Sequence, residues 1–374
     1  MVCQTTFDYN FYNNNNGEVA NDTRKRVTIV GGGNWGSAIA CVIGKTVKAQ
    51  PDDFFPIVTM WCRDSRKPGD TSESVADTIN RTHENAKYLP GRRIPDNVIA
   101  TSNLLDACST SHILILVVPH QGIEQICNEL NGRLLPDAVA VSLTKGISSE
   151  NNKMKLISQD IEDFLGVECN VLMGANLAGE VADEKFCEAT LGCRSAENTG
   201  IILKKLFDTP NFRVRVTDDF EAVELCGALK NIVACAAGFA DGLGWAYNLK
   251  SAIIRLGLIE TREFVNTYYP SSKGHTYLES CGIADLITTC YGGRNRRVAE
   301  AFIKSDKPLK EIEMELLKGQ SAQGPPTAQD VFEMNEIYGF SEKFPIFTSV
   351  HKIFAGEQTP DHLYNSIRRH FAYE

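Results

Sequence analysis

Residues 27–40 hold an apolar strand, a glycine-rich turn and the start of a helix rich in small residues. The turn reads Gly31-Gly32-Gly33-Asn34-Trp35-Gly36 and fits the pattern G-x-G-x-x-G. In such a turn Gly31 allows the tight bend, Gly33 lets a diphosphate approach the backbone, and Gly36 lets the helix pack closely against the strand. The free N–H groups of the first helical turn then face the anion. The segment therefore predicts a parallel α/β sheet that begins with a dinucleotide-binding unit.

The rest of the chain separates into a part with strands and a part that is typical of helices only. Strand-like runs alternate with helical stretches as far as Val216, which favours a mostly parallel sheet with helices on both faces. Beyond it, long segments show helical periodicity. We therefore predict an α/β protein: a disordered, asparagine-rich tail at 1–22, a Rossmann-type doubly wound parallel sheet domain at 23–216, and an all-helical domain at 217–374. The expected strands are 27–30, 57–61, 113–118, 138–143, 171–173 and 212–216, and the expected helices of the second domain are 220–239, 250–268, 283–291, 296–303, 309–317 and 328–337.

Charge and composition limit the classes of function. A formal charge of −9 argues against binding to nucleic acid or to an anionic membrane surface, so any anion site must be local. No apolar run approaches the length needed to cross a bilayer, because the longest, 113–119, ends in a proline, so we expect no membrane-spanning segment. The 12 cysteines are scattered singly through apolar segments, and no apolar signal segment opens the chain. We expect reduced thiols, no metal site and a cytoplasmic protein.

Polar side chains follow several expected strands, at the sheet edge where ligands of such folds bind. Arg63 and Asp64 follow the second strand, where a carboxylate can bind the ribose hydroxyls of an adenosine. Arg63 could instead stack on the adenine or, with Arg66 and Lys67, attract a 2′-phosphate, and a solvated basic loop is the alternative. Lys145 follows a fully apolar strand and precedes a glycine. Its ammonium is expected to project into the ligand crevice, although most lysines are solvated surface residues.

The helix expected at 220–239 carries one lysine in a segment poor in charge. Small residues such as Gly227 and Ala234 let other elements approach it closely. Burial of the Lys230 ammonium would lower its pKa from about 10.4 toward neutrality, which suits a general acid. The alternative is a lysine that snorkels from a core helix to water. The neighbouring Asn231 argues against it, because an amide is also costly to bury without partners.

Two further clusters lie in the helical part. Asp285 and Thr289 are four residues apart, so they project from one face of an otherwise apolar helix, where the carboxylate could hold a lysine. The segment Gly292-Gly293-Arg294-Asn295 precedes an expected helix start, so backbone N–H groups and one guanidinium can form a phosphate-sized pocket. We assign the next two arginines, Arg296 and Arg297, to a solvated face.

Six motifs occur in order along both domains: residues 31–36, Val117-Val118-Pro119-His120-Gln121, Ser142-Leu143-Thr144-Lys145-Gly146, Met173-Gly174-Ala175-Asn176, Glu224-Leu225-Cys226-Gly227-Ala228-Leu229-Lys230-Asn231 and Gly292-Gly293-Arg294-Asn295. Together they resemble the NAD-dependent glycerol-3-phosphate dehydrogenases of the soluble eukaryotic type. The resemblance implies reversible reduction of dihydroxyacetone phosphate to sn-glycerol 3-phosphate by NADH, with a lysine as general acid and base. Such an activity links glycolysis to glycerolipid synthesis and to cytosolic NADH balance, and relatives suggest a homodimer built on the helical domain.

The resemblance also implies roles for individual residues. Lys230 matches the catalytic lysine that protonates the carbonyl oxygen, and Asp285 and Thr289 match its supporting residues. Lys145 matches a second substrate lysine. Arg294 and Asn295, aided by Asn231, match the family residues that bind the substrate phosphate. The expected contacts with NAD, from the resemblance and from the strand ends together, are Gly31, Gly32, Gly33, Asn34, Trp35, Gly36, Arg63, Asp64, Pro119, Gly122, Lys145, Ala178, Arg294 and Gln323.

The chain departs from the common family pattern at three positions. Relatives often have an aromatic residue in place of Arg63 and of Gly122, and a lysine in place of Ser321. These departures affect the cofactor site more than the catalytic residues. We favour NAD over NADP because Asp64 remains available to ribose hydroxyls and would repel a 2′-phosphate.

Two other functions remain open from the sequence. Other two-domain dehydrogenases, acting on a sugar phosphate or a hydroxyacyl thioester, should lack the motifs around Lys230 and Arg294. A non-catalytic dinucleotide sensor would be expected to have lost the lysine or its carboxylate, and both are present.

Overall fold

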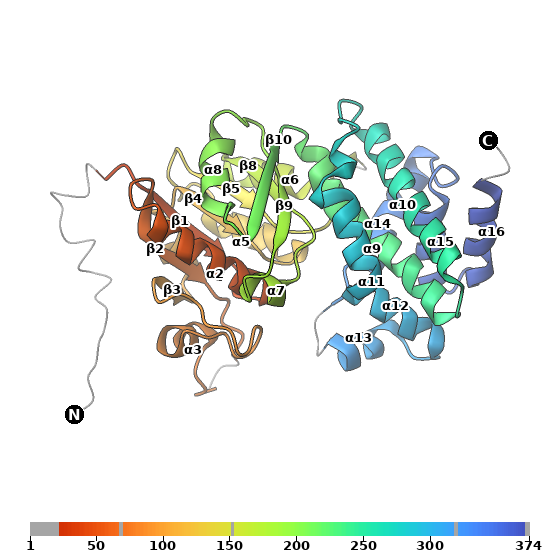
Figure 1. Ribbon diagram of the computed structural model, residues 1–374, viewed down its shortest axis with the longest axis horizontal. Helices are drawn as coiled ribbons and strands as arrows, with labels where there is room; N and C mark the ends of the chain where they lie inside the picture. The colour runs from red at the N-terminus through yellow and green to blue at the C-terminus, as the bar shows by residue number, and fades with distance from the viewer. Residues whose placement is uncertain (1–21, 67–69, 151–152, 318–320, 371–374) are drawn as a thin grey trace.

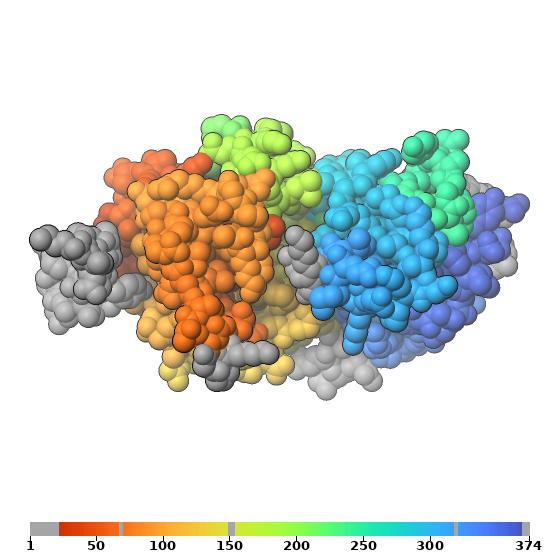
Figure 2. Space-filling view, turned by 90° about the horizontal axis from the view of Figure 1, so that it is seen from below, coloured from red at the N-terminus to blue at the C-terminus, as the bar shows by residue number. Residues whose placement is uncertain are grey.

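The chain is described from a computed structural model for residues 22–66, 70–150, 153–317 and 321–370. It forms two parts that lie side by side, a sheet flanked by helices and a bundle of helices (Figure 1). In the view from below, the two parts meet along one seam (Figure 2). The tail expected at 1–22 lies outside the described residues except for Asp22, and Lys67 also lies outside them.

The sheet has eight strands in the order β10-β9-β8-β5-β4-β1-β2-β3. Strand β1 pairs in parallel with both β2 and β4, so the strand order reverses there, at the point where doubly wound sheets bind dinucleotides. Strands β9 and β10 run antiparallel to the others. The Rossmann-type, doubly wound and mostly parallel sheet is thereby confirmed. Its strands are β1 (Lys25–Val30), β2 (Phe54–Trp61), β3 (Val98–Thr101), β4 (Ile113–Leu116), β5 (Val139–Ser142), β8 (Glu168–Met173), β9 (Cys187–Gly192) and β10 (Phe212–Thr217).

The sequence does not predict β3, β9 or the small antiparallel hairpin of β6 (Ser148–Glu150) and β7 (Lys153–Lys155). Strand β3 is only four residues long and pairs with β2 at the edge of the sheet. Strand β9 places Glu188 and Thr190 between its apolar residues. Pairing with neighbouring strands, rather than a long apolar run, makes these segments strands.

Helices cover both faces of the sheet (Figure 1). Helix α2 begins directly after Gly33 and covers one face of the sheet. Its residues Ile39 and Ile43 pack with Ile29 of β1 in one apolar cluster. A separate cluster, which includes Ile126, lies on the other face. The helices of the first face are α2 (Asn34–Ala49), α3 (Val75–Thr82), α7 (Ala178–Ala182) and α8 (Thr199–Phe207), and those of the second are α4 (Leu104–Cys108), α5 (Ile123–Leu130) and α6 (Ile157–Leu165).

The helical part is built around α9 (Phe220–Gly242), which is buried at every residue from 222 to 240. Small residues allow this burial, since a Cβ at Gly238 would lie 2.3 Å from the backbone oxygen of Arg296. Among the described residues beyond Thr217 there is no strand, so the all-helical part is also confirmed. The sequence does not predict its last two helices. The helices around α9 are α10 (Tyr247–Tyr268), α11 (Asp285–Gly292), α12 (Arg294–Lys304), α13 (Leu309–Leu317), α14 (Gly324–Tyr338), α15 (Pro345–Phe354) and α16 (Pro360–His370), with short turns η3 (Thr276–Leu278) and η4 (Ser280–Ala284) before α11.

Helix α9 is also long and apolar enough to cross a membrane, judged by length and composition alone. This corrects our expectation that no segment approaches that length. Glu221, Glu224 and Lys230 interrupt the apolar run in the sequence, yet the mean hydropathy of its most apolar window is 1.4. That whole window is buried inside the protein, so α9 serves here as a core helix.

The two parts share a core at the seam. Met173 of β8 belongs to the apolar cluster around α9, and a Cβ at Gly227 would lie 2.6 Å from its sulfur. Ser280 of η4 donates to the backbone oxygen of Glu188 at 2.6 Å and accepts from the backbone N–H of Ala175 at 3.2 Å. We keep a boundary at 216/217 as a proposal for the chain's organisation, with the core continuous across it.

The cysteines behave as small apolar side chains. All 11 cysteines among the described residues are free thiols, and only Cys187 of these is not fully buried. Burial raises the pKa of Cys41 to about 11, so its thiol is protonated at neutral pH. Within the described ranges no three His, Cys, Asp or Glu side chains gather to hold a metal ion.

Candidate active site

The glycine turn has the backbone geometry that its sequence predicts. Gly31 has a φ of 134°, and a Cβ there would lie 2.4 Å from the backbone oxygen of Val117 at the end of β4. A Cβ at Gly36 would lie 1.9 Å from the oxygen of Gly31, so only glycine lets α2 approach this closely. At Gly33 a Cβ would meet no atom within 4 Å. Half-buried Trp35 packs against the cluster under α2. The turn is therefore tightly packed on both sides of an open position at the N-terminus of α2.

A buried asparagine that the sequence does not single out supports this turn. Asn85 Nδ2 donates to the backbone oxygen of Gly32 at 2.9 Å and to Ser37 Oγ at 2.8 Å. Asn34 reaches the same loop and donates to the backbone oxygen of Tyr88 at 2.9 Å. The partners of Asn85 are about 50 residues away in the chain, so no local pattern identifies it.

Three of the predicted catalytic residues form one buried cluster between α9 and α11. Lys230 Nζ donates to Asp285 Oδ1 and, at 2.6 Å, to Thr289 Oγ1. The side chains of Lys230 and Asp285 are 7% and 3% exposed. Burial lowers the pKa of Lys230 to about 7, although the charge of Asp285 opposes this shift. The alternative of a snorkelling lysine is wrong, because its ammonium is held inside the protein.

Lys145 reaches the same carboxylate from the sheet part. Its Nζ lies 3.4 Å from Asp285 Oδ2, and its side chain is 30% exposed. Asp285 therefore joins two ammonium groups, one from each part of the molecule. The charge of Lys145 adds to the effect of burial and further lowers the pKa of Lys230.

The candidate phosphate-binding residues lie at the N-terminus of α12. Gly293 is the N-cap and Arg294 the first helical residue, so the first N–H groups of α12 have no partner within the helix. Part of Arg294 is exposed to solvent. The protein around it still removes enough water from the guanidinium to lower its pKa. Asn295 is buried, donates to Asn231 Oδ1 at 2.8 Å and accepts from the N–H of Gly324 at 2.8 Å. Its side chain thus ties α9 and α14 to α12.

Four further candidates for contact with the cofactor lie at the starts of helices. Ala178 opens α7 just after β8, and Gln323 is the N-cap of α14. Pro119 precedes the short turn η2 (His120–Gly122), which follows β4. A Cβ at Gly122 would meet no atom within 4 Å, so packing does not require glycine there.

The adenosine-side candidates lie on the surface after β2. Arg63 is exposed and donates to Gln125 Oε1 at 3.3 Å. Asp64 accepts from Arg66, with 2.6 Å between Oδ2 and Nη2 and 3.0 Å between Oδ1 and the backbone N–H. The Arg66 side chain holds the pKa of Asp64 at about 2. Asp64 is therefore ionised, and its charge is already paired.

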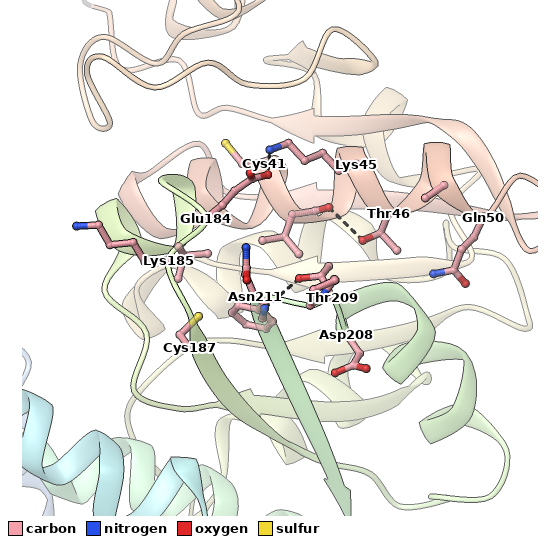
Figure 3. Close-up of a pocket in the computed structure, with 15 residues that line it drawn as sticks. Cys41, Lys45, Thr46, Gln50, Glu184, Lys185, Cys187, Asp208, Thr209 and Asn211 are labelled. Carbon is pink, nitrogen blue, oxygen red and sulfur yellow. Dashed lines mark hydrogen bonds and ion pairs between the residues drawn. The ribbon is translucent and has the colours of Figure 1, made fainter.

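A separate cavity of about 400 Å³ lies along the C-terminal half of α2, next to α7 and the start of β10 (Figure 3). Lys45 and Glu184 form an ion pair at its wall. No predicted site residue lines this cavity, so it is not part of the candidate site.

Comparisons with known proteins agree over both parts of the chain. The family description "NAD-dependent glycerol-3-phosphate dehydrogenase N-terminus" matches residues 26–199, and the corresponding C-terminus matches 219–365. The chain is 53% identical over 362 residues to the probable glycerol-3-phosphate dehydrogenase 2 of Caenorhabditis elegans, covering 94% of this chain and 92% of that one. It is 50% identical over 331 residues to the cytoplasmic NAD(+) glycerol-3-phosphate dehydrogenase of Homo sapiens, covering 88% and 93%. The solved structure of glycerol-3-phosphate dehydrogenase from Saccharomyces cerevisiae gives a TM-score of 0.84 at 40% identity, covering 92% of this chain and 99% of that one.

Proposed function

Because the chain belongs to the NAD-dependent glycerol-3-phosphate dehydrogenase family, we propose that its Lys230 cluster carries the reversible reduction of dihydroxyacetone phosphate to sn-glycerol 3-phosphate. The chain interconverts these two compounds with NAD as its redox cofactor. One observation carries our assignment of residues: the Lys230 ammonium is buried and bonded to Asp285 and Thr289. A group with a pKa near the working pH both gives and takes a proton efficiently.

Lys230 performs the proton transfer. In the direction of reduction, its Nζ gives a proton to the carbonyl oxygen of the substrate, so that the new alcohol leaves uncharged. In the reverse direction the neutral amine takes the proton of the hydroxyl group. Asp285 and Thr289 fix the position of Nζ through their hydrogen bonds. Lys145 adds positive charge near the oxygen on which negative charge develops.

The N-terminus of α12 binds the substrate phosphate. The first-turn N–H groups of α12 and the Arg294 guanidinium supply charge-assisted hydrogen bonds to the phosphate oxygens. Asn295 contributes through its backbone N–H, because its side chain already bonds Asn231 and Gly324. Asn231 in turn aligns this helix with Lys230, its neighbour in the chain.

The residues around the glycine turn fit a dinucleotide. The open position at Gly33 and the N-terminus of α2 would hold the pyrophosphate, with Asn34 and Trp35 beside it. Arg63 and Asp64 would face the adenosine, and Pro119, Gly122, Ala178 and Gln323 would provide further contacts with the cofactor. When bound there, NADH supplies the hydride that reduces the carbonyl carbon.

We further propose that the chain acts as a cytoplasmic homodimer. The human and Drosophila relatives are named cytoplasmic. Large apolar side chains are exposed on the helical part, among them Tyr247 at 84%, Leu278 at 74% and Met314 at 66%, and a subunit contact built on this part would cover such side chains. Sedimentation equilibrium at micromolar concentration tests this, since a monomer there would contradict it.

The test of the proposed function is NADH oxidation in the presence of dihydroxyacetone phosphate. Lys230→Ala should lower kcat by about 1,000-fold, as expected for loss of a general acid. Exposed Lys304→Ala on α12 serves as the matched lysine control and should leave kcat unchanged. Equal rates for wild type and Lys230→Ala would disprove the role of Lys230. Binding of NADH without any wild-type turnover would favour the dinucleotide sensor instead.

A further inference from the structure

The short turn η4 leads directly into the helix that carries Asp285. It spans Ser280–Ala284, and Asp285 is the first residue of α11. The turn is not a regular helix, since Gly282 has a ψ of −105°, and a Cβ there would lie 2.3 Å from the backbone oxygen of Tyr277. Single turns of this π type are frequent at functional sites. The position of η4 therefore determines where α11 begins.

Two buried hydroxyl groups attach this turn to the sheet part. Ser280 Oγ donates to the backbone oxygen of Glu188 at 2.6 Å and accepts from the backbone N–H of Ala175 at 3.2 Å. Thr190 Oγ1 accepts from the backbone N–H of Cys281, also at 3.2 Å. Glu188 and Thr190 belong to β9, and Ala175 follows β8. Three hydrogen bonds therefore fix the start of η4 to the sheet part.

The carboxylate of Asp285 depends on this attachment, because its two lysine partners come from different parts of the molecule. Lys230 lies on α9 in the helical part, and Lys145 follows β5 in the sheet part. Asp285 Oδ1 accepts from Lys230, and Oδ2 lies 3.4 Å from Lys145 Nζ. An ion pair extends to about 4 Å, so a displacement of α11 by less than about 1 Å would break the contact with Lys145.

We propose that Ser280 and Thr190 are positioning residues, which hold the start of α11 against the sheet part so that Asp285 contacts both ammonium groups at once. Both act through the backbone around η4 rather than on the substrate. This inference rests on the proposed function, because the position of Asp285 affects turnover only if Lys230 transfers the proton. Misplacement of a catalytic group by about 1 Å can lower a rate by about 100-fold.

Removal of the Ser280 hydroxyl should affect turnover more than substrate binding. Ser280→Ala should lower kcat for reduction of dihydroxyacetone phosphate about 10-fold, because Asp285 is displaced. KM for this substrate should stay within about 3-fold, since the phosphate-binding residues lie on α12.

The matched control is Ser158→Ala. Ser158 of α6 is also buried, and its Oγ also bonds across the seam, to Glu224 of α9. Its loss should weaken the seam but leave kcat within about 2-fold. An equal loss of kcat in Ser158→Ala and Ser280→Ala would overturn the proposal, because any weakening of the seam would then have the same effect.

Two substitutions of Thr190 provide a second comparison, which also serves if Ser280→Ala does not fold. Valine keeps the shape of the side chain but removes the oxygen that accepts from Cys281. Thr190→Val should therefore lower kcat about 5-fold, the value of one hydrogen bond, whereas Thr190→Ser keeps the oxygen and should stay within about 2-fold of wild type. Equal kcat values for the two variants would overturn the proposal.

A double-mutant cycle with Asp285→Asn tests whether Ser280 acts through the carboxylate. If it does, Ser280→Ala should lower kcat by less than about 2-fold in the Asp285→Asn background. The full loss of about 10-fold in that background would overturn the proposal, because Ser280 would then act on turnover without Asp285.

A crystal structure of Ser280→Ala provides a readout that does not depend on turnover. Asp285 Oδ2 should lie more than about 4 Å from Lys145 Nζ, beyond the reach of an ion pair. An unchanged contact would overturn the proposal. If Lys230→Ala turned over substrate as fast as the wild type, the proposed function would fail instead, and this structure would still test the position of Asp285.

Discussion

The two ends of the proposed site are built in opposite ways. At the reactive end, Lys230 and Asp285 are buried and bonded to each other between two helices. At the adenosine end, Asp64 and Arg66 form their ion pair on the surface. Charges act more strongly on one another where water is excluded, and exposed pairs contribute little. Burial, rather than the number of charged contacts, should therefore decide where a substitution changes function most.

After replacement of Lys230 itself, replacing its partner Asp285 should have the largest effect. Asp285→Asn keeps the shape of the side chain but removes the charge that favours the ammonium form of Lys230. Lys230 would then be mostly neutral at pH 7, and kcat for reduction of dihydroxyacetone phosphate should fall about 100-fold. Thr289→Val removes only a neutral hydroxyl and should cost clearly less. If both variants lost the same activity, the charge of Asp285 would not be what matters.

Arg294→Ala should have an intermediate effect, on substrate binding. Loss of hydrogen bonds to a charged phosphate should raise KM for dihydroxyacetone phosphate about 10- to 100-fold. The matched control is Arg297→Ala, which removes an exposed arginine one turn along α12 and should leave KM within about 2-fold. A similar rise in both variants would place the phosphate elsewhere.

The smallest effect is expected at the adenosine end. Arg66→Ala should change kcat/KM for NADH by less than about 5-fold, because the pair that it breaks is exposed. It should increase the preference for NADH over NADPH, since the unpaired Asp64 carboxylate repels a 2′-phosphate. Arg81→Ala, which breaks another exposed pair with Glu73, should change neither value. An effect of Arg66→Ala larger than that of Arg294→Ala would reverse the comparison between the two ends.

The same comparison explains what the sequence could predict. The glycine turn follows from its own residues, because Gly31 and Gly36 occupy positions that no Cβ fits. Lys230 could be found because a charge-poor helix implies burial, and a buried ammonium needs the partner that Asp285 provides.

Residues whose role depends on distant partners could not be found. Asn85 looks like an ordinary loop residue until the fold brings Gly32 against it. The sequence predicted that Asn295 belongs to the site, but it did not predict that its side chain bonds Asn231. The reversed direction of β9 likewise depends on which strand it pairs with.

The most direct test of the account is the pH dependence of kcat/KM in both directions. Burial sets the pKa of Lys230 to about 7, and reduction needs the ammonium form whereas oxidation needs the neutral amine. The rate of reduction of dihydroxyacetone phosphate should therefore fall, and the rate of oxidation of sn-glycerol 3-phosphate should rise, as pH increases through about 7. Profiles that are flat across this range, or that change in the same direction for both reactions, would contradict a general acid and base at Lys230.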